Sequence, residues 1–119
     1  MTVQRYIQEN MGRTLRQNVK DDGTLIGLPH PYTVPCADGM FNELYYWDTY
    51  FTNKALFALG QAEQAKNNIK DILYLIDRFG YMPNGNRTGF LRRSQPPYAT
   101  LMVDDVYRAT NDLSFLKSA

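Results

Sequence analysis

Apolar residues recur at every fourth position in the N-terminal part of the chain, at Val3, Ile7, Met11, Leu15 and Val19. This spacing keeps the side chains near one face of a helix, and Tyr6 widens the apolar stripe. Asp21, Asp22 and Gly23 follow, and glycine tolerates the left-handed conformation in which helices commonly end. The pattern therefore predicts an amphipathic helix that runs from the N-terminus to just before Gly23.

Helical periodicity returns in three later segments. The first begins near Asp48 or Thr49, either of which could cap it, and ends at Gly60. The second covers 62–79 and the third covers 98–110, with a final turn capped by Asn111 or Asp112. Because only a short connection separates the first two of these helices, we expect them to form an antiparallel hairpin.

Two long irregular stretches, 24–46 and 80–97, interrupt this helical pattern. Pro29, Pro31 and Pro35 disfavour helix in the residues before them. Neither stretch carries a convincing strand pattern. The order helix, loop, helix, helix, loop, helix predicts an all-α protein.

Composition excludes several classes of protein. Thirteen basic and twelve acidic residues are interspersed, so no nucleic-acid footprint is present. No apolar run approaches the roughly 18 residues that a membrane span needs, and the N-terminus lacks the apolar core of a secretory signal. We therefore expect a cytoplasmic chain with no membrane partner. His30 and Cys36 are the only residues of their types, so we expect no metal, no cofactor and no internal disulfide.

The loop at 82–97 is the most informative part of the sequence. Connections longer than about 12–15 residues in compact domains usually have a functional reason. This loop is rich in amides and guanidinium groups and has no carboxylate: Asn84, Asn86, Arg87, Arg92, Arg93, Ser94 and Gln95. Such donors suit a ligand made mostly of hydroxyls, or an anion. The alternative is a solvated, capped turn.

Both ends of this loop, Pro-Asn-Gly-Asn-Arg at 83–87 and Arg-Ser-Gln-Pro-Pro at 93–97, resemble the sugar-binding loop of the trehalase family, the family 37 glycoside hydrolases. The segment 41–51, which contains Tyr-Tyr-Trp-Asp, is similar to a second signature of that family, and 28–35 is similar to the approach to it. The resemblance implies part of an α/α toroid, a ring of six helical hairpins. The two irregular stretches would line its central pocket.

The resemblance also implies a set of residues that bind a small-molecule sugar, either trehalose or a related α-glucoside. These residues are Trp47, Asp48, Asn84, Arg93, Ser94 and Gln95. The structural alternatives are that Trp47 belongs to the core and that Arg93 pairs with Asp48. Arg87, Arg92 and Asn86 are expected to be structural. Met40 stands where the family has an arginine, and methionine cannot donate to a sugar hydroxyl, so the identity of the sugar stays open.

The family's chains are several times longer than this one, and the resemblance covers roughly 25–110. We therefore expect 1–119 to be a single, incomplete segment of a larger glycosidase domain. Inverting hydrolysis needs two carboxyl groups about 6.5–9.5 Å apart. The resemblance places both in motifs downstream, one of them Gly-Trp-Asp. The only tryptophan here, Trp47, follows a tyrosine, so we expect no catalytic residue.

Glu43 and Asp48 are expected to cap and hydrogen-bond near a helix start and not to act as an acid–base pair. The predicted function is the substrate-pocket segment of an inverting α,α-trehalase-like hydrolase, inactive alone. The alternative is a non-catalytic carbohydrate-binding or helical interaction module. Anion binding by Arg87, Arg92 and Arg93 ranks last, because no glycine-rich phosphate loop precedes a helix.

Overall fold

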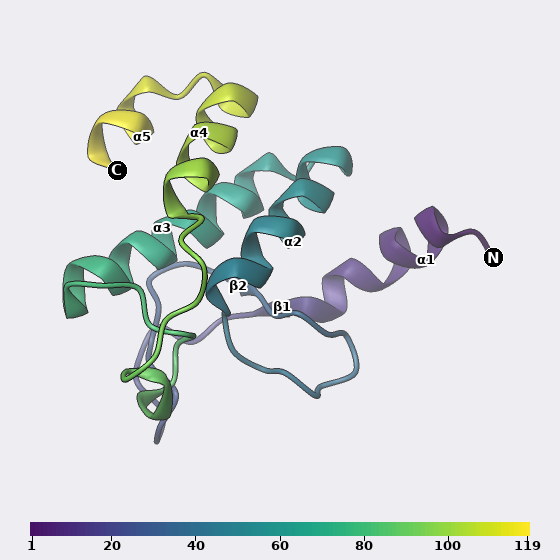
Figure 1. Ribbon diagram of the computed structural model, residues 1–119. Coiled ribbons are helices and arrows are strands. Elements are labelled where there is room, and N and C mark those ends of the chain that lie inside the picture. The colour runs from purple at the N-terminus through teal and green to yellow at the C-terminus, as the bar shows by residue number, and fades with distance from the viewer.

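The computed structural model describes residues 1–119 and is built mainly of helices (Figure 1). The α-helices are α1 (Val3–Asn10), α2 (Tyr46–Ala58), α3 (Ala62–Phe79), α4 (Ala99–Thr110) and α5 (Leu113–Ser118). The 3-10 helices are η1 (Met11–Thr14) and η2 (Thr88–Phe90), and the strands are β1 (Leu15–Arg16) and β2 (Tyr32–Thr33). None of these helices combines the length and the apolar composition that a membrane span requires.

Helix α3 is the centre of the packing, with α2 and α4 against it and α5 against α4. Its apolar stripe places Ile69, Ile72 and Leu75 fully out of solvent. Gly60, at φ 73°, makes the tight turn between α2 and α3, as the glycine in the sequence predicted. The turn into α5 is also as predicted, because Asp112 Oδ1 accepts from the Phe115 N–H at 3.0 Å.

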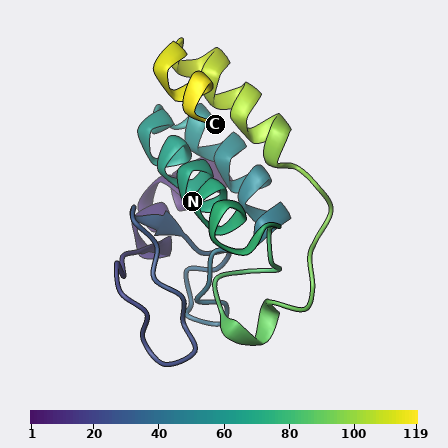
Figure 2. The same ribbon diagram turned by 90° about the vertical axis from the view of Figure 1, so that its left-hand side faces the viewer.

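A buried amide joins this helical layer to the irregular part of the chain. Asn68 of α3 has no exposed surface. Its Nδ2 donates to Thr33 Oγ1 at 2.9 Å and to Asn53 Oδ1 at 3.0 Å, and its Oδ1 accepts from the Thr33 N–H at 3.0 Å. One side chain thus ties together α2, α3 and β2. Figure 2 shows the result, with α4 and α5 stacked on α2 and α3 and the long loops gathered at the opposite end.

The predicted N-terminal helix is wrong in length. Helix α1 ends at Asn10, and the chain continues through η1 into β1, which pairs antiparallel with β2 in the register Leu15↔Thr33. No residue of α1 is buried, and Val19 is exposed. The spacing of four continues past Asn10, but Leu15 and Val19 stay exposed, and the backbone pairs with β2 at Leu15 and Arg16 instead of continuing the helix.

The start of α2 also differs from the prediction. The helix begins at Tyr46 and not at Asp48 or Thr49, and neither of those side chains caps it. The Thr49 hydroxyl instead donates back to the Tyr45 carbonyl within the first turn. Asp48 therefore lies inside the first turn, where its carboxylate is close to the positive end of the helix dipole.

Candidate functional site

Backbone pairing holds the two sequence motifs side by side. Tyr45 and Gly85 form an antiparallel bridge. The Tyr46 N–H donates to the Asn84 carbonyl at 3.1 Å, and the Asn86 N–H donates to the Leu44 carbonyl at 3.2 Å. Gly85 permits this close approach, because a Cβ atom at that position would lie 2.9 Å from the Leu44 carbonyl oxygen.

Asn86 fixes the pairing from inside and has no exposed surface. Its Oδ1 accepts from the Leu44 N–H at 2.7 Å, and its Nδ2 donates to the Ile26 carbonyl at 3.0 Å. The expectation that Asn86 is structural is therefore confirmed. Three segments that are distant in sequence meet at this one amide.

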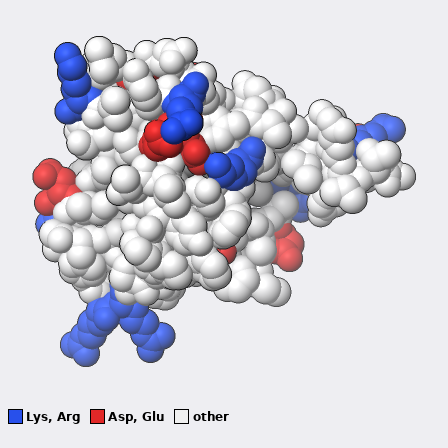
Figure 3. All heavy atoms as spheres, turned by 45° about the horizontal axis from the view of Figure 1, so that its top comes forward, with Lys and Arg blue, Asp and Glu red and all other residues white.

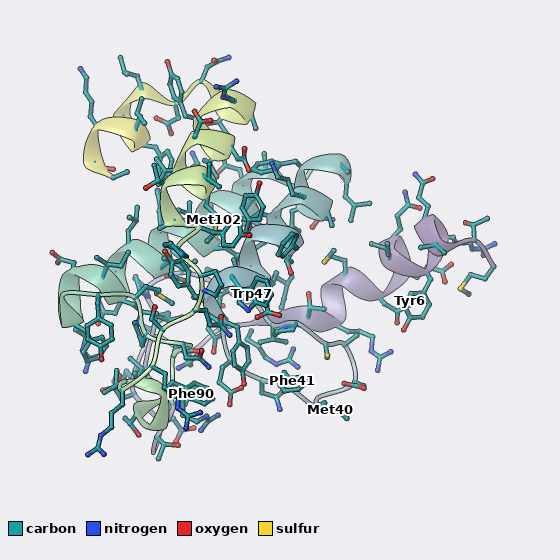
Figure 4. All side chains as sticks on the ribbon, viewed as in Figure 1. Tyr6, Met40, Phe41, Trp47, Phe90 and Met102 are labelled. Atoms are coloured by element: carbon teal, nitrogen blue, oxygen red, sulfur yellow. The ribbon has the colours of Figure 1, made fainter.

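A cavity of about 380 Å³ opens beside the paired motifs. Its wall combines aromatic rings with polar groups: Pro35, Cys36, Phe41, Tyr45, Trp47, Asp48 and Gln95. Trp47 is 39% exposed, so it is not a core residue. Its ring stacks on Tyr98 with centroids 6.5 Å apart and planes at 27°. Figure 4 shows Trp47 at the start of α2, with Phe41 on the loop nearby.

Gln95 connects the far end of the polar loop to the start of α2. Its Oε1 accepts from the backbone N–H of Trp47 at 3.1 Å, across a sequence separation of 48 residues. Gln95 thereby takes the role that was predicted for a local capping residue. Because Oε1 is engaged, the Nε2 group is the part of Gln95 left to donate to a ligand.

Asp48 lies half-buried on the cavity wall and accepts no hydrogen bond from the chain. The alternative pairing with Arg93 does not occur, because Arg93 forms no ion pair and its side chain is exposed. An unpartnered carboxylate beside an aromatic face can accept from sugar hydroxyls. Three of the six predicted site residues, Trp47, Asp48 and Gln95, thus share one cavity.

The other three predicted site residues are not on its wall. Asn84 is half-buried and its side chain makes no hydrogen bond, while its backbone N–H donates to the Arg93 carbonyl at 2.9 Å. Ser94 Oγ donates to the Met82 carbonyl at 2.7 Å, which fixes the loop. Met40 is 72% exposed and lies at the tip of its loop in Figure 4, away from Trp47.

A second polar group adjoins the cavity. Arg87 Nε donates to Glu43 Oε1 at 2.6 Å, and the Tyr45 hydroxyl donates to Glu43 Oε2 at 2.8 Å. Arg87 also donates from Nη1 to Thr24 Oγ1 at 2.8 Å. Burial of Tyr45 and its hydrogen bond to Glu43 raise the pKa of Tyr45 to about 12. Glu43 is thus engaged by hydrogen bonds, as expected, although it does not cap α2.

Sequence reasoning missed Tyr45, Pro35, Cys36 and Phe41 as cavity residues. Tyr45 and Tyr46 are adjacent in the sequence. Which of the two lines the cavity depends on the residue at which α2 begins, and the sequence did not predict that residue correctly. Tyr46 is buried, and its hydroxyl accepts from the Ala99 N–H at 3.1 Å. No cluster of three potential metal ligands exists in the chain.

The chain is similar to a known protein family, to curated proteins and to a solved structure. A family model described as Trehalase matches residues 2–119, a longer match than the resemblance over 25–110. The chain is 47% identical over 87 residues to a periplasmic trehalase of Xanthomonas campestris, and this match covers 73% of this chain and 15% of that protein. It is 43% identical over 94 residues to a trehalase of Oryctolagus cuniculus, covering 79% of this chain and 16% of that one.

The fold agrees with a solved structure. Neutral trehalase Nth1 from Saccharomyces cerevisiae superposes with a TM-score of 0.68 and 32% identity, over 74% of this chain and 17% of that chain. The predictions of an all-α fold and of the early hairpins of an α/α toroid are confirmed. The chain spans about 15% of the length of the curated relatives it matches.

The expected cytoplasmic location is wrong. Several relatives at 42–47% identity are named periplasmic trehalases, from Xanthomonas campestris and Pseudomonas aeruginosa among others. These names point to the periplasm. The expectation rested on the absence of a signal-like pattern at the N-terminus of this sequence, which does not decide the location of a protein whose relatives are so much longer.

Proposed function

Because the chain belongs to the trehalase family, we propose that it supplies part of the sugar pocket of a periplasmic, inverting α,α-trehalase-like glycoside hydrolase. Residues 1–119 would form one segment of the larger catalytic domain. The observation that carries the proposal is the shared cavity of Trp47, Asp48 and Gln95, which the paired motifs bring together.

These side chains offer complementary chemistry for one pyranose ring. The exposed face of Trp47 would cover the C–H face of the sugar, where an apolar flat surface is favourable. Asp48 would accept from hydroxyls, and Gln95 Nε2 would donate to a ring or hydroxyl oxygen. Asn84 and Arg93 lie on the same loop and would reach the sugar only from outside the cavity wall.

Hydrolysis would need groups from beyond this segment. An inverting mechanism requires an acid and a base on opposite sides of the glycosidic bond. Glu43 is held by Arg87 and Tyr45, and Asp48 is then the only free carboxylate on the cavity wall. The segment alone is therefore expected to bind sugar without cleaving it.

Fluorescence of Trp47 tests the binding proposal directly, because Trp47 is the only tryptophan. Titration with trehalose and with glucose should give a saturable change. The D48N variant should weaken binding by about tenfold, which corresponds to about 1.4 kcal/mol. The matched control is D104N, since Asp104 is exposed on α4 and pairs only with Arg108. No response to any sugar, or equal responses of D48N and wild type, would refute the binding role.

A panel of α-linked glucosides tests the reaction and its substrate in the full-length gene product. Release of glucose from trehalose would support the trehalase assignment, and release from another disaccharide alone would shift the specificity, as Met40 allows. Sugar binding without cleavage of any substrate would favour the alternative, a non-catalytic carbohydrate-binding module.

A further inference from the structure

The ion pair between Glu43 and Arg87 is connected to the cavity wall through Tyr45. Glu43 is only 9% exposed, and each of its carboxylate oxygens has one partner, Arg87 on Oε1 and Tyr45 on Oε2. The Tyr45 ring is held between two aromatic neighbours, with centroids 5.9 Å from Phe41 and 5.6 Å from Phe90. These contacts favour one orientation of the ring and of its hydroxyl hydrogen.

We propose that Glu43, held by Arg87, is a positioning residue that makes Tyr45 an acceptor-only group toward the sugar. This inference rests on the proposed sugar-binding function. An ionised carboxylate can only accept, so Tyr45 must direct its single hydrogen to Glu43. Tyr45 lines the cavity, and the lone pairs of its phenolic oxygen are then the only polar feature that it can offer to a ligand there.

The consequence is a defined pattern of hydrogen-bond polarity in the cavity. Tyr45 and Asp48 both accept, whereas Gln95 has its Nε2 group free to donate, since its Oε1 already accepts from the Trp47 N–H. A ligand hydroxyl beside Tyr45 must donate. Glucose hydroxyls can do so, but a fluorine at the same position cannot, although it has a similar size.

The E43Q variant should invert this polarity without changing the shape of the site. Arginine has donors only, so the new amide oxygen must face Arg87. The amide NH₂ then faces Tyr45 and donates to its oxygen. The hydroxyl hydrogen of Tyr45 must turn elsewhere, and the cavity is where it can find an acceptor.

The first experiment needs no sugar. NMR titration with ¹³C-labelled tyrosine follows the ionisation of Tyr45, whose signal is identified by its loss in Y45F. Wild type should titrate near a pKa of about 12, because burial and Glu43 both raise it. In E43Q the pKa of Tyr45 should fall toward the ordinary value of 10.0. An unchanged Tyr45 titration in a folded E43Q variant would overturn the proposal.

The second experiment tests the hydrogen-bond polarity of the cavity. It measures the affinity of glucose and of its monodeoxy and monofluorodeoxy analogues by Trp47 fluorescence. In wild type, one fluoro analogue should bind about tenfold more weakly than glucose, as weakly as the matching deoxy sugar. In E43Q that fluoro analogue should bind better than the deoxy sugar. Equal losses for every analogue in E43Q would indicate a merely structural role and would contradict the proposal.

Two tyrosine variants keep the test decisive if E43Q does not fold. Y45F leaves the Glu43–Arg87 pair in place and should abolish the difference between glucose and that fluoro analogue. Y46F is the matched control, since Tyr46 is buried away from the cavity, and it should retain the difference. A wild-type chain that binds no sugar would refute the proposed function, while the Tyr45 titration would still decide the role of Glu43.

Discussion

At the scale of single residues, two asparagines in one loop show how differently similar side chains are used. Asn86 is completely buried and makes two hydrogen bonds to backbone groups of distant segments. Asn84, two positions earlier, makes none with its side chain. Their local sequence context is nearly the same, so the separation of a structural Asn86 from a ligand candidate Asn84 rested on the family resemblance and not on the residue pattern.

Replacing each asparagine by alanine should separate the two roles. N86A leaves the Leu44 N–H and the Ile26 carbonyl buried without partners, and should lower the free energy of unfolding by about 2–5 kcal/mol. N84A should change it by less than about 0.5 kcal/mol, because no intramolecular bond is lost. Chemical denaturation measures both. Equal losses in the two variants would show that the hydrogen bonds of Asn86 are not what stabilises the paired motifs.

Asp71 on α3 should make stability depend on pH. It is fully buried, its Oδ1 accepts from the His30 N–H at 2.9 Å, and its Oδ2 has no partner. Burial raises the pKa of Asp71 from 3.8 to about 8. Because the folded-state pKa exceeds the unfolded one, the folded chain binds this proton more tightly. Stability should fall as pH rises from about 4 to about 8, and then level off.

The D71N variant should remove this dependence, since an amide stays neutral and can still accept from His30. Near pH 4 its melting temperature should match wild type, and at pH 8 or above it should be higher by about 5 °C or more. D77N is the control, because Asp77 is exposed on the same helix. A pH profile of D71N that runs parallel to wild type between pH 4 and pH 8 would contradict the assignment.

At the scale of elements, hydrophobic periodicity predicted helices correctly where neighbouring segments pack against the apolar face. It predicted helix length wrongly where no neighbouring segment buries that face. Helices α2, α3 and α4 lie within a few residues of the predicted segments, because each contributes buried apolar residues to the common core, although α2 buries Thr49 and Asn53 as well and leaves Phe51 exposed. The N-terminal stripe has the same pattern, but none of its residues is fully buried, and the chain leaves the helix after Asn10. The cap of α2 comes from Gln95, which no local pattern could indicate. The family motifs identified Trp47, Asp48 and Gln95, but only the pairing of segments reveals Tyr45.

The pairing of the two motif segments depends on one glycine. In G85A the new Cβ atom would lie 2.9 Å from the Leu44 carbonyl oxygen and 3.2 Å from the Phe90 ring, so the segments must separate. We expect a loss of about 1–3 kcal/mol in stability and weaker sugar binding, because Tyr45 would shift. G89A in the same loop meets nothing within 4 Å and should change stability by less than about 0.5 kcal/mol. A neutral G85A would show that the bridge between Tyr45 and Gly85 is not essential.

At the scale of the whole molecule, burial is distributed unevenly. Helix α3 contributes six buried residues to the structure, whereas α1 contributes none and projects from the body in Figure 1. Val3 is 78% exposed and Tyr6 is 54% exposed. The surface in Figure 3 likewise shows broad uncharged areas between scattered charged side chains. Local stability should therefore fall from the α3 core toward the N-terminus.

Hydrogen exchange measures this gradient residue by residue. Amides of α3 should exchange only through opening of the whole core, and amides of α1 should exchange about a hundredfold faster or more, because fraying costs little there. The measurement should be made at two protein concentrations. Slow exchange in α1 at both concentrations would contradict the gradient. Protection of α1 that appears only at the higher concentration would mean that its apolar face is covered by a second copy, since no intramolecular contact depends on concentration.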